Sequence, residues 1–309
     1  MRAWALAVPI GLLLAAGAAS PAPGQIARFS AQSSLVVLSA TAVDKDGRPV
    51  TNLKREDFRI LEDGRPQRIE HFAPGQDSPL RVLFLADASG SMTGELKIAS
   101  TRMALVQLLA SLGPQDQAAL AAFDHKYWGV VQFTTDRKAI EKAYADIEPF
   151  SSTALHDALD HASHDVASHG EGRRAVVVLT DGIDTASTKT AEEVIAKSRA
   201  LDVPIYTVTV VSPIDDPGSE RYTGDRKADA GKGAAVLTRY AEMSGGRSFT
   251  VSDFRGLKEA ADRIVGELKH QYRLGYDPPP GPPVFRRIAV QSTRKGVVIK
   301  TRSGYVPQS

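Results

Sequence analysis

The sequence predicts an α/β protein whose central sheet is doubly wound, mostly parallel and covered by helices on both faces. Three observations support this prediction. Strand-like apolar runs alternate with helical patterns between residues 80 and 270, and such alternation is typical of parallel sheets. Two of these runs, 82–86 and 175–179, are apolar without interruption, as expected for strands that are buried on both faces. Polar residues follow both runs directly, at the sheet edge where open α/β folds bind their ligands.

Composition limits the possible classes of function. Hydrophobic residues make up 42% of the 309 positions and charged residues 24%, which is ordinary for a globular protein. The 38 Lys and Arg residues nearly balance the 36 Asp and Glu residues, so the net charge gives no reason to expect binding to nucleic acid or to an anionic membrane. The chain has no Cys, which excludes disulfides, thiolate metal sites and a cysteine nucleophile.

The start of the chain predicts export. Arg2 precedes an apolar run over 4–19, broken by Pro9, and the run ends in small residues. These are the features of a signal peptide, which we place at residues 1–20, with a flexible tether over 21–33. The alternative is an uncleaved N-terminal anchor, although the run is short for a membrane-spanning helix and no later segment qualifies as one. We therefore expect a periplasmic or extracellular protein without a transmembrane segment after signal removal.

The N-terminal flank of the α/β region has an extended pattern. Residues 34–43 alternate with period two, and residues 44–47 (Asp-Lys-Asp-Gly) predict a turn. The same four residues resemble a fragment of a calcium loop, but they lack its later ligands and its closing glutamate. An Asp-Gly pair at 63–64 predicts a hairpin, with a further strand over 67–72.

The C-terminal flank is extended as well. After a proline-rich loop, the segments 285–293 and 296–302 predict a strand pair. Each flank alone is near the lower size limit for folding without disulfides or metal. We therefore expect residues 34–77 and 271–309 to build one small β-sandwich-like domain, into which the α/β domain of residues 78–270 is inserted. The alternative is two independent, hairpin-rich extensions.

Strands and helices alternate between the flanks. The strand at 127–133 is expected to form one antiparallel edge of the sheet. The long polar loop 212–233 follows a strand and should lie at the ligand edge, where Arg221 and Tyr222 either contact a partner or are merely exposed. The apolar positions of the first helix are Leu96, Ala99, Met103, Val106 and Ala110. The other strands are expected at 81–86, 117–123, 174–180, 203–211 and 247–251, and the other helices at 136–147, 154–168, 190–201, 234–243 and 254–269.

The polar residues after the first buried strand have the chemistry of a cation site. Asp87, Ser89 and Ser91 alternate along the chain, so in a tight loop their oxygens can converge on one point. Hard oxygen donors of this kind suit Mg²⁺ or a similar cation. The alternative is an ordinary strand-to-helix turn in which a serine caps the helix. Thr153 opens a later helix and Asp181 follows the other buried strand, so both are expected at the same sheet edge.

The order Asp-x-Ser-x-Ser, a distant Thr and a distant Asp resembles the metal ion-dependent adhesion site of the von Willebrand factor type A family. The resemblance covers about residues 79–270, and it includes Leu-Thr-Asp-Gly at 179–182 and Met-Ser-Gly-Gly-Arg at 243–247. It implies the Rossmann-like fold of that family and a site for Mg²⁺ or Mn²⁺ that a partner protein completes with an Asp or Glu carboxylate. The metal ligands that it implies are Asp87, Ser89, Ser91, Thr153 and Asp181.

The layout of the whole chain also resembles a bacterial exported subgroup, the VWFA-related proteins described from acidobacteria. This resemblance depends on short segments in both flanks, at 43–50, 53–58, 61–64, 271–276 and 302–305. The ligand of that subgroup is generally unknown, so this resemblance supplies no substrate. From the metal-site pattern we expect an exported binding protein and not an enzyme.

Two other classes of function remain open at this point. A serine hydrolase would use Ser89 as nucleophile and His156 as base, but Ser89 lacks the Gly-x-Ser-x-Gly elbow. An envelope assembly scaffold would need no occupied metal site. His161 and His164 could join a second metal site of softer ligands, although a solvated polar face is the simpler interpretation in an amphipathic helix.

Overall fold

The computed structural model describes residues 35–74, 79–93, 95–170, 172–211 and 225–307. The expected signal peptide and tether, together with Arg221 and Tyr222, lie outside these residues. The polar loop after residue 211 is shorter than expected, because helix α5 (Asp225–Ser244) begins within it. None of the helices in the described part of the chain is both long and apolar enough to cross a membrane.

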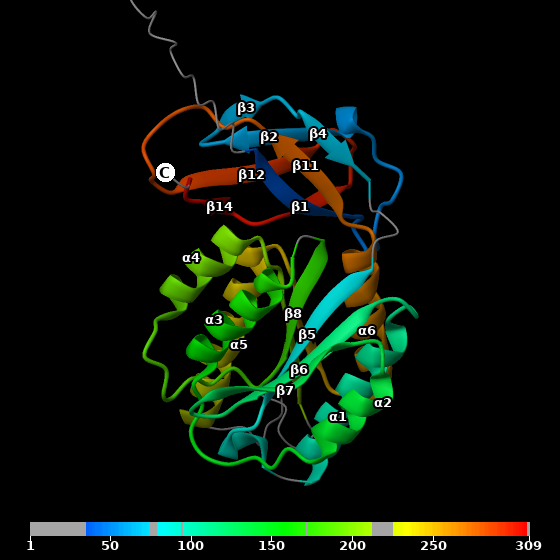
Figure 1. Ribbon diagram of the computed structural model, residues 1–309, viewed down its shortest axis with the longest axis vertical. Helices are drawn as coiled ribbons and strands as arrows, with labels where there is room; N and C mark the ends of the chain where they lie inside the picture. The colour runs from blue at the N-terminus through cyan, green and yellow to red at the C-terminus, as the bar shows by residue number, and fades with distance from the viewer. Residues whose placement is uncertain (1–34, 75–78, 94, 171, 212–224, 308–309) are drawn as a thin grey trace, which may run out of the picture. The chain divides into compact units, whose positions relative to one another are not determined.

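A six-stranded sheet forms the centre of the α/β region (Figure 1). Its strand order is β10-β9-β8-β5-β6-β7, and all neighbours are parallel except β6 and β7. This confirms the mostly parallel sheet with one antiparallel edge. Because β5 and β8 are parallel neighbours, the loops that follow them lie at the same edge. The strands are β5 (Leu80–Asp87), β6 (Gln117–Phe123), β7 (Tyr127–Thr134), β8 (Arg173–Leu179), β9 (Ile205–Val210) and β10 (Ser248–Val251).

Helices cover both faces of the sheet (Figure 1). Successive side chains of a strand point to opposite faces, so Phe84 enters the core under α1, α2 and α6, whereas Leu85 enters the core under α3, α4 and α5. The double burial explains why the runs in β5 and β8 are apolar without interruption. The helices are α1 (Glu95–Ser111), α2 (Arg137–Ala145), α3 (Leu155–Ser168), α4 (Ala191–Leu201) and α6 (Phe254–Lys269).

The prediction of which residues form the buried face of α1 is wrong. Met103 is 46% exposed and Ala110 is exposed as well, whereas Leu105 and Leu108 are buried in the core. The helix is apolar around much of its circumference, so the spacing of its apolar residues does not define one face.

The two flanks form one β-sandwich of two four-stranded sheets, with the strand orders β13-β1-β11-β4 and β14-β12-β2-β3. Each sheet combines strands of both flanks, because β1 pairs with β11 and β2 pairs with β12. This confirms the small sandwich-like domain and contradicts independent extensions; its boundaries remain a prediction. The strands are β1 (Val36–Val43), β2 (Phe58–Glu62), β3 (Arg65–Gln67), β4 (His71–Ala73), β11 (Tyr272–Tyr276), β12 (Arg286–Ser292), β13 (Val298–Lys300) and β14 (Gly304–Tyr305).

Two details of the flanks differ from the prediction. The strand expected over 67–72 is divided, since β3 ends at Gln67 and β4 begins at His71 in the other sheet. The strands expected to pair over 285–302 do not pair, because β12 and β13 belong to different sheets. A period-two pattern identifies a strand but does not identify its partner.

Two turns form as predicted. The Asp-Gly pair has positive φ at both residues, 48° at Asp63 and 79° at Gly64, as a two-residue hairpin turn requires. The Asp44 carboxylate accepts hydrogen bonds from the backbone N–H groups of Asp46 and Arg48, each at 2.9 Å. These bonds close a local turn, and they account for the acidic residues there without a calcium ion.

A buried carboxylate joins the two flanks inside the sandwich. Glu62 of β2 is 3% exposed and accepts hydrogen bonds from Arg286 at 2.8 Å and Tyr305 at 3.1 Å, and another from Tyr276. All three donors belong to the C-terminal flank. A buried carboxylate that has lost its partners is costly, so this cluster strongly favours closure of the sandwich by both flanks.

Arg302 connects the sandwich to the end of α4. Its side chain is buried, and the guanidinium donates to the carbonyl oxygens of Arg199 at 2.6 Å and Val37 at 2.8 Å. Its Nε lies 3.4 Å from the carboxylate of Asp202, which also accepts hydrogen bonds from Ser39 of β1. One arginine therefore contacts α4, β1 and the residue that ends α4.

Candidate functional site

The loop after β5 holds three of the predicted ligands in one turn. Asp87 and Ser89 are buried, whereas Ser91 is exposed. One carboxylate oxygen of Asp87 accepts the backbone N–H of Ser89 at 2.9 Å, and the other accepts the hydroxyl of Thr180 at 2.5 Å. The hydroxyl oxygens of Ser89 and Ser91 are 3.1 Å apart. The loop therefore brings a carboxylate and two hydroxyls together at the carboxyl edge of the sheet.

The segment before Thr153 is hydrogen-bonded to this loop. Gly90 donates its N–H to the carbonyl of Ser151 at 2.8 Å, and Phe150 donates to the carbonyl of Ala88 at 2.7 Å. Ser151 has a φ of 76°, an uncommon conformation for a residue other than glycine. These two bonds bring Thr153, at the start of α3, to the same sheet edge as Asp87.

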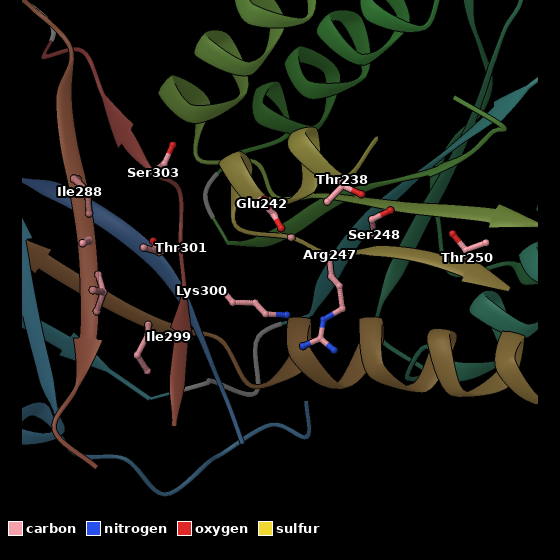
Figure 2. Close-up of a pocket in the computed structure, with 13 residues that line it drawn as sticks. Thr238, Glu242, Arg247, Ser248, Thr250, Ile288, Ile299, Lys300, Thr301 and Ser303 are labelled. Atoms are coloured by element: carbon pink, nitrogen blue, oxygen red, sulfur yellow. The ribbon is translucent and has the colours of Figure 1, made fainter. Parts of the chain in front are cut away.

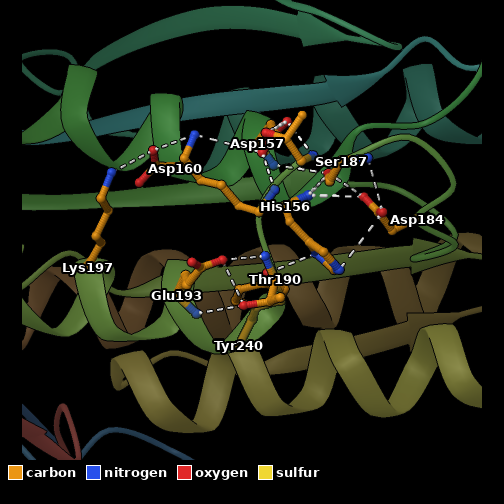
Figure 3. A network of polar contacts seen from close by, with 11 residues as sticks. His156, Asp157, Asp160, Asp184, Ser187, Thr190, Glu193, Lys197 and Tyr240 are labelled. Carbon is orange, nitrogen blue, oxygen red and sulfur yellow. Dashed lines mark hydrogen bonds and ion pairs between the residues drawn. The ribbon is translucent and has the colours of Figure 1, made fainter.

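The loop after β8 is tied to the start of α3. Thr185 donates its N–H to the carbonyl of Thr153 at 2.8 Å, and its hydroxyl accepts the N–H of Thr153 at 2.9 Å. Further along, the carboxylate of Asp184 accepts from the hydroxyl of Ser187 at 2.6 Å and from the backbone N–H of His156 at 3.3 Å (Figure 3). This network fixes the loop that carries Asp181 relative to Thr153.

Asp181 is held from one side only. Its Oδ2 accepts a hydrogen bond from the ammonium of Lys97 at 2.9 Å, whereas its Oδ1 is buried and has no hydrogen-bond partner. The same ammonium donates to the carbonyl of Ser91 at 2.8 Å. Lys97 therefore places the Asp181 carboxylate next to the loop of Ser89 and Ser91.

Gly182, directly after Asp181, allows a close approach of α5. It has a φ of +85°, and a Cβ at this position would lie 2.8 Å from the carbonyl oxygen of Gly233 and 2.7 Å from the side chain of Leu237. Only glycine combines this conformation with this contact. The backbone beside Asp181 is therefore packed tightly against α5.

Burial dominates the electrostatics of Asp87. It raises the pKa of the Asp87 carboxyl from 3.8 to about 6, and the nearby charge of Asp181 acts in the same direction, while the hydrogen bonds from Ser89 and Thr180 oppose the change. A carboxylate that is poorly solvated and close to a second carboxylate is stabilised by a bound cation.

The donor set fits a hard divalent cation. The buried Oδ1 of Asp181 is free to accept a ligand bond, and the carboxylate of Asp87 and the hydroxyls of Ser89 and Ser91 are neutral or anionic oxygens. Mg²⁺ and Mn²⁺ prefer such ligands. Within the described residues, no three His, Cys, Asp or Glu side chains gather into a group that could hold a metal, so an ion bound here would need hydroxyl oxygens among its ligands.

Comparison with known families gives the same assignment of the fold. The sequence model of the von Willebrand factor type A domain matches residues 82–263, more than half of the chain. The chain belongs to this family. The match begins within β5 and ends within α6, so it spans the loops of Asp87, Thr153 and Asp181 and excludes both flanks.

Curated relatives match over part of their length. The mouse inter-alpha-trypsin inhibitor heavy chain 4 is 33% identical over 132 residues, which are 38% of this chain and 14% of that protein. An uncharacterised protein of Borreliella burgdorferi is 25% identical over 209 residues, 60% of this chain and 57% of that protein. The chain thus spans less than two thirds of either relative.

Solved structures share the type A fold at low sequence identity. A von Willebrand factor type A protein from Catenulispora acidiphila matches with a TM-score of 0.51 and 12% identity, over 89% of this chain and 75% of that one. An aerotolerance-related membrane protein from Bacteroides fragilis matches with a TM-score of 0.50 and 19% identity, over 61% of this chain and 98% of that one. At these identities the similarity concerns the fold alone.

The geometry of the type A domain does not favour a serine hydrolase. Ser89 is buried, and its hydroxyl contacts the hydroxyl of Ser91 at 3.1 Å rather than an imidazole. The imidazole of His156 lies 2.9 Å from the hydroxyl of Tyr240 and 4.0 Å from the carboxylate of Asp184 (Figure 3). His156 therefore belongs to the network that fixes the loop after β8.

The other histidines have structural surroundings. His161 stacks on Tyr127 of β7, with ring centroids 5.4 Å apart. No group of metal-binding side chains includes His161 or His164 in the described part of the chain. Both side chains are exposed, as expected for a solvated polar face of α3.

A cavity of about 540 Å³ lies between the type A domain and the sandwich (Figure 2). The cationic groups of Arg247 and Lys300, which line it, both contact one carboxylate oxygen of Glu267, at 2.7 and 3.3 Å. Glu242 is the acidic residue of the lining, so together with the buried Glu267 two negative side chains offset the two positive ones. Such a balance does not select a charged ligand, and the loops of Asp87 and Asp181 do not line this cavity.

The sequence did not reveal two residues of the site. Thr180 hydrogen-bonds to Asp87, and a hydroxyl directly before a predicted ligand at a strand end is a usable signal. Lys97 contacts both Ser91 and Asp181. A lysine in the first turn of a helix is usually solvated, so its spacing from Ser91 gives no signal without the position of Asp181.

Proposed function

We propose that this protein is an exported, divalent-cation-dependent binding module of the adhesion type. Its type A domain binds Mg²⁺ or Mn²⁺ and captures an Asp or Glu side chain of a partner protein. The observation that carries the proposal is the buried, unpartnered Oδ1 of Asp181 next to the loop of Asp87, Ser89 and Ser91. Membership of a family of protein-interaction modules supports it.

The proposed ligands differ in how they would contact the ion. Ser89, Ser91 and Thr153 are the candidates for direct ligands, while Asp87 and Asp181 act directly or through water. When bound, the ion supplies a coordination position that a carboxylate oxygen can occupy. Asp87 supplies negative charge from a buried position, and Thr180 and the backbone of Ser89 fix its orientation.

The surroundings of the site favour an accessible surface rather than a closed pocket. Ser91 is exposed, and Phe150, whose backbone N–H is hydrogen-bonded to the proposed metal loop (residues 87–91), is 76% exposed. An exposed aromatic ring beside a charged site is typical of protein interaction surfaces. The apolar start of the chain supports export, and the balanced net charge gives no support to nucleic-acid binding.

Replacement of Asp181 by Ala tests the metal site. We expect the variant to bind Mn²⁺ at least about tenfold more weakly in calorimetry, because a ligand matters at least as much as the outer residues of metal sites, which contribute 10- to 100-fold. In wild type, Mn²⁺ at a hundred times its dissociation constant should stabilise the fold by about 2.7 kcal/mol. Asp262→Ala is the matched control, since Asp262 lies in an exposed pair with Lys258.

Equal Mn²⁺ affinity in wild type and Asp181→Ala would contradict the proposal. Absence of Mn²⁺ and Mg²⁺ binding in wild type would instead favour an assembly scaffold that does not depend on metal.

A further inference from the structure

Lys97 is a cation built into the proposed metal site. It lies in the first turn of α1, directly after the metal loop, and its side chain is only 20% exposed. Its ammonium is 2.9 Å from Oδ2 of Asp181 and 2.8 Å from the carbonyl oxygen of Ser91. A lysine ammonium has three donors and is strongly hydrated in water. Its placement here therefore requires these two acceptors.

The Lys97 ammonium makes the two carboxylate oxygens of Asp181 different from each other. Oδ2 is occupied by Lys97, and the buried Oδ1 remains without a partner. An ion bound at Oδ1 would share this carboxylate with the ammonium. The two positive charges would then lie close together on one side chain and would repel each other, and the partial burial of Lys97 and Asp181 limits screening by water.

The count of charges gives the consequence. The carboxylates of Asp87 and Asp181 carry two negative charges, which neutralise the two positive charges of a divalent ion. Lys97 adds one positive charge that remains unneutralised. A loaded site with this surplus attracts a further carboxylate more strongly than a neutral site does. The same surplus positive charge lowers the affinity of the site for the ion itself.

We propose that Lys97 is a positioning and charge-setting residue, which lowers the affinity of the site for the metal and raises the affinity of the loaded site for an acidic partner. This inference rests on the proposed function, because it assumes that the ion binds at Asp181. It assigns Oδ1 of Asp181 to the ion and Oδ2 to Lys97.

Replacement of Lys97 by Met tests the inference, because Met keeps the length of the side chain and removes the charge. We expect Lys97→Met to bind Mn²⁺ more than tenfold more tightly than wild type in calorimetry. Partial unfolding cannot produce this gain in affinity. Lys97→Arg, which keeps the charge, should stay within about threefold of wild type, and Lys258→Met is the control for loss of an exposed lysine.

Acetate serves as the probe for the acidic partner. Wild type and Lys97→Met are each saturated with Mn²⁺ and titrated with acetate, and water-proton relaxation reports the water that acetate displaces from the ion. We expect the acetate affinity of Lys97→Met to be at least threefold lower than that of wild type.

The outcomes separate this inference from the proposed function. Tight Mn²⁺ binding by wild type with equal or weaker binding by Lys97→Met overturns the role of Lys97 and leaves the metal site intact. Unchanged acetate affinity in a variant that binds Mn²⁺ more tightly overturns the assignment of the surplus charge to the partner. Failure of wild type to bind Mn²⁺ overturns both proposals.

Discussion

Asp87→Asn should stabilise the metal-free protein. The Asp87 carboxyl is 4% exposed, and burial raises its pKa from 3.8 to about 6. At 1.36 kcal/mol for each pKa unit, the ionised carboxylate costs the fold about 3 kcal/mol at neutral pH. Asn keeps an acceptor for the N–H of Ser89 but leaves the hydroxyl of Thr180 without its acceptor, at a cost of about 1 kcal/mol. The expected net gain is about 2 kcal/mol.

Urea unfolding in the presence of EDTA measures this gain. The sign of its pH dependence follows from the raised pKa of Asp87. The carboxyl is largely protonated in both states below pH 3.8, and the cost of its ionisation develops between this pH and about 6, above which it is fully present. The stability difference between Asp87→Asn and wild type should therefore be largest at pH 7.5 and should shrink progressively toward pH 4.5. Asp262→Asn, at an exposed pair, is the control and should show no such dependence.

Two results would refute this reasoning. One is a variant that is less stable than wild type in EDTA at pH 7.5, which would mean that the hydrogen bonds of Asp87 outweigh its desolvation. The other is a stability difference that does not change between pH 4.5 and 7.5. Addition of Mn²⁺ gives a second readout, since it should stabilise wild type much more than Asp87→Asn.

Two further predictions concern the sandwich. Deletion of residues 278–309 removes β12, β13 and β14, so β1 and β2 should lose amide-exchange protection while β5 keeps its own. Unchanged protection in β1 and β2 would mean that the flanks do not share a core. Arg302→Met removes a buried guanidinium that Asp202 and three backbone carbonyls contact, and urea unfolding should show a loss of about 3 kcal/mol. Arg48→Met, at an exposed pair, should leave the unfolding curve unchanged.

The sequence predicted the elements that local chemistry defines. The buried strands of the sheet follow from uninterrupted apolar runs, and the hairpin at Asp63 and Gly64 follows from the conformations that this pair adopts. The order of the candidate ligands was visible because each directly follows a strand or opens a helix. Their arrangement at one edge is in accord with the parallel pairing of β5 and β8.

Other features depend on distant partners and could not be predicted. The buried face of α1 is set by the sheet beneath it, so Met103 is exposed although it matches the helical period. The sheet that β13 joins is set by β1, which lies far away in the sequence. Lys97 acquires its role only through Asp181, which lies 84 residues later. Local patterns carry no information about such pairings.

The sandwich that both flanks share also dictates when the chain can finish folding. Glu62 cannot accept the hydrogen bond from Tyr305 until that residue, 243 positions further along the chain, has been synthesised. At about 5–20 residues per second, a ribosome needs on the order of 10–50 seconds to make that stretch. During this time β1 and β2 have no strand partners from the C-terminal flank, while the α/β domain, which lies between the two flanks in the sequence, can already fold. The strands of the C-terminal flank therefore complete the sandwich, and they shield β1 and β2 from pairing with other chains.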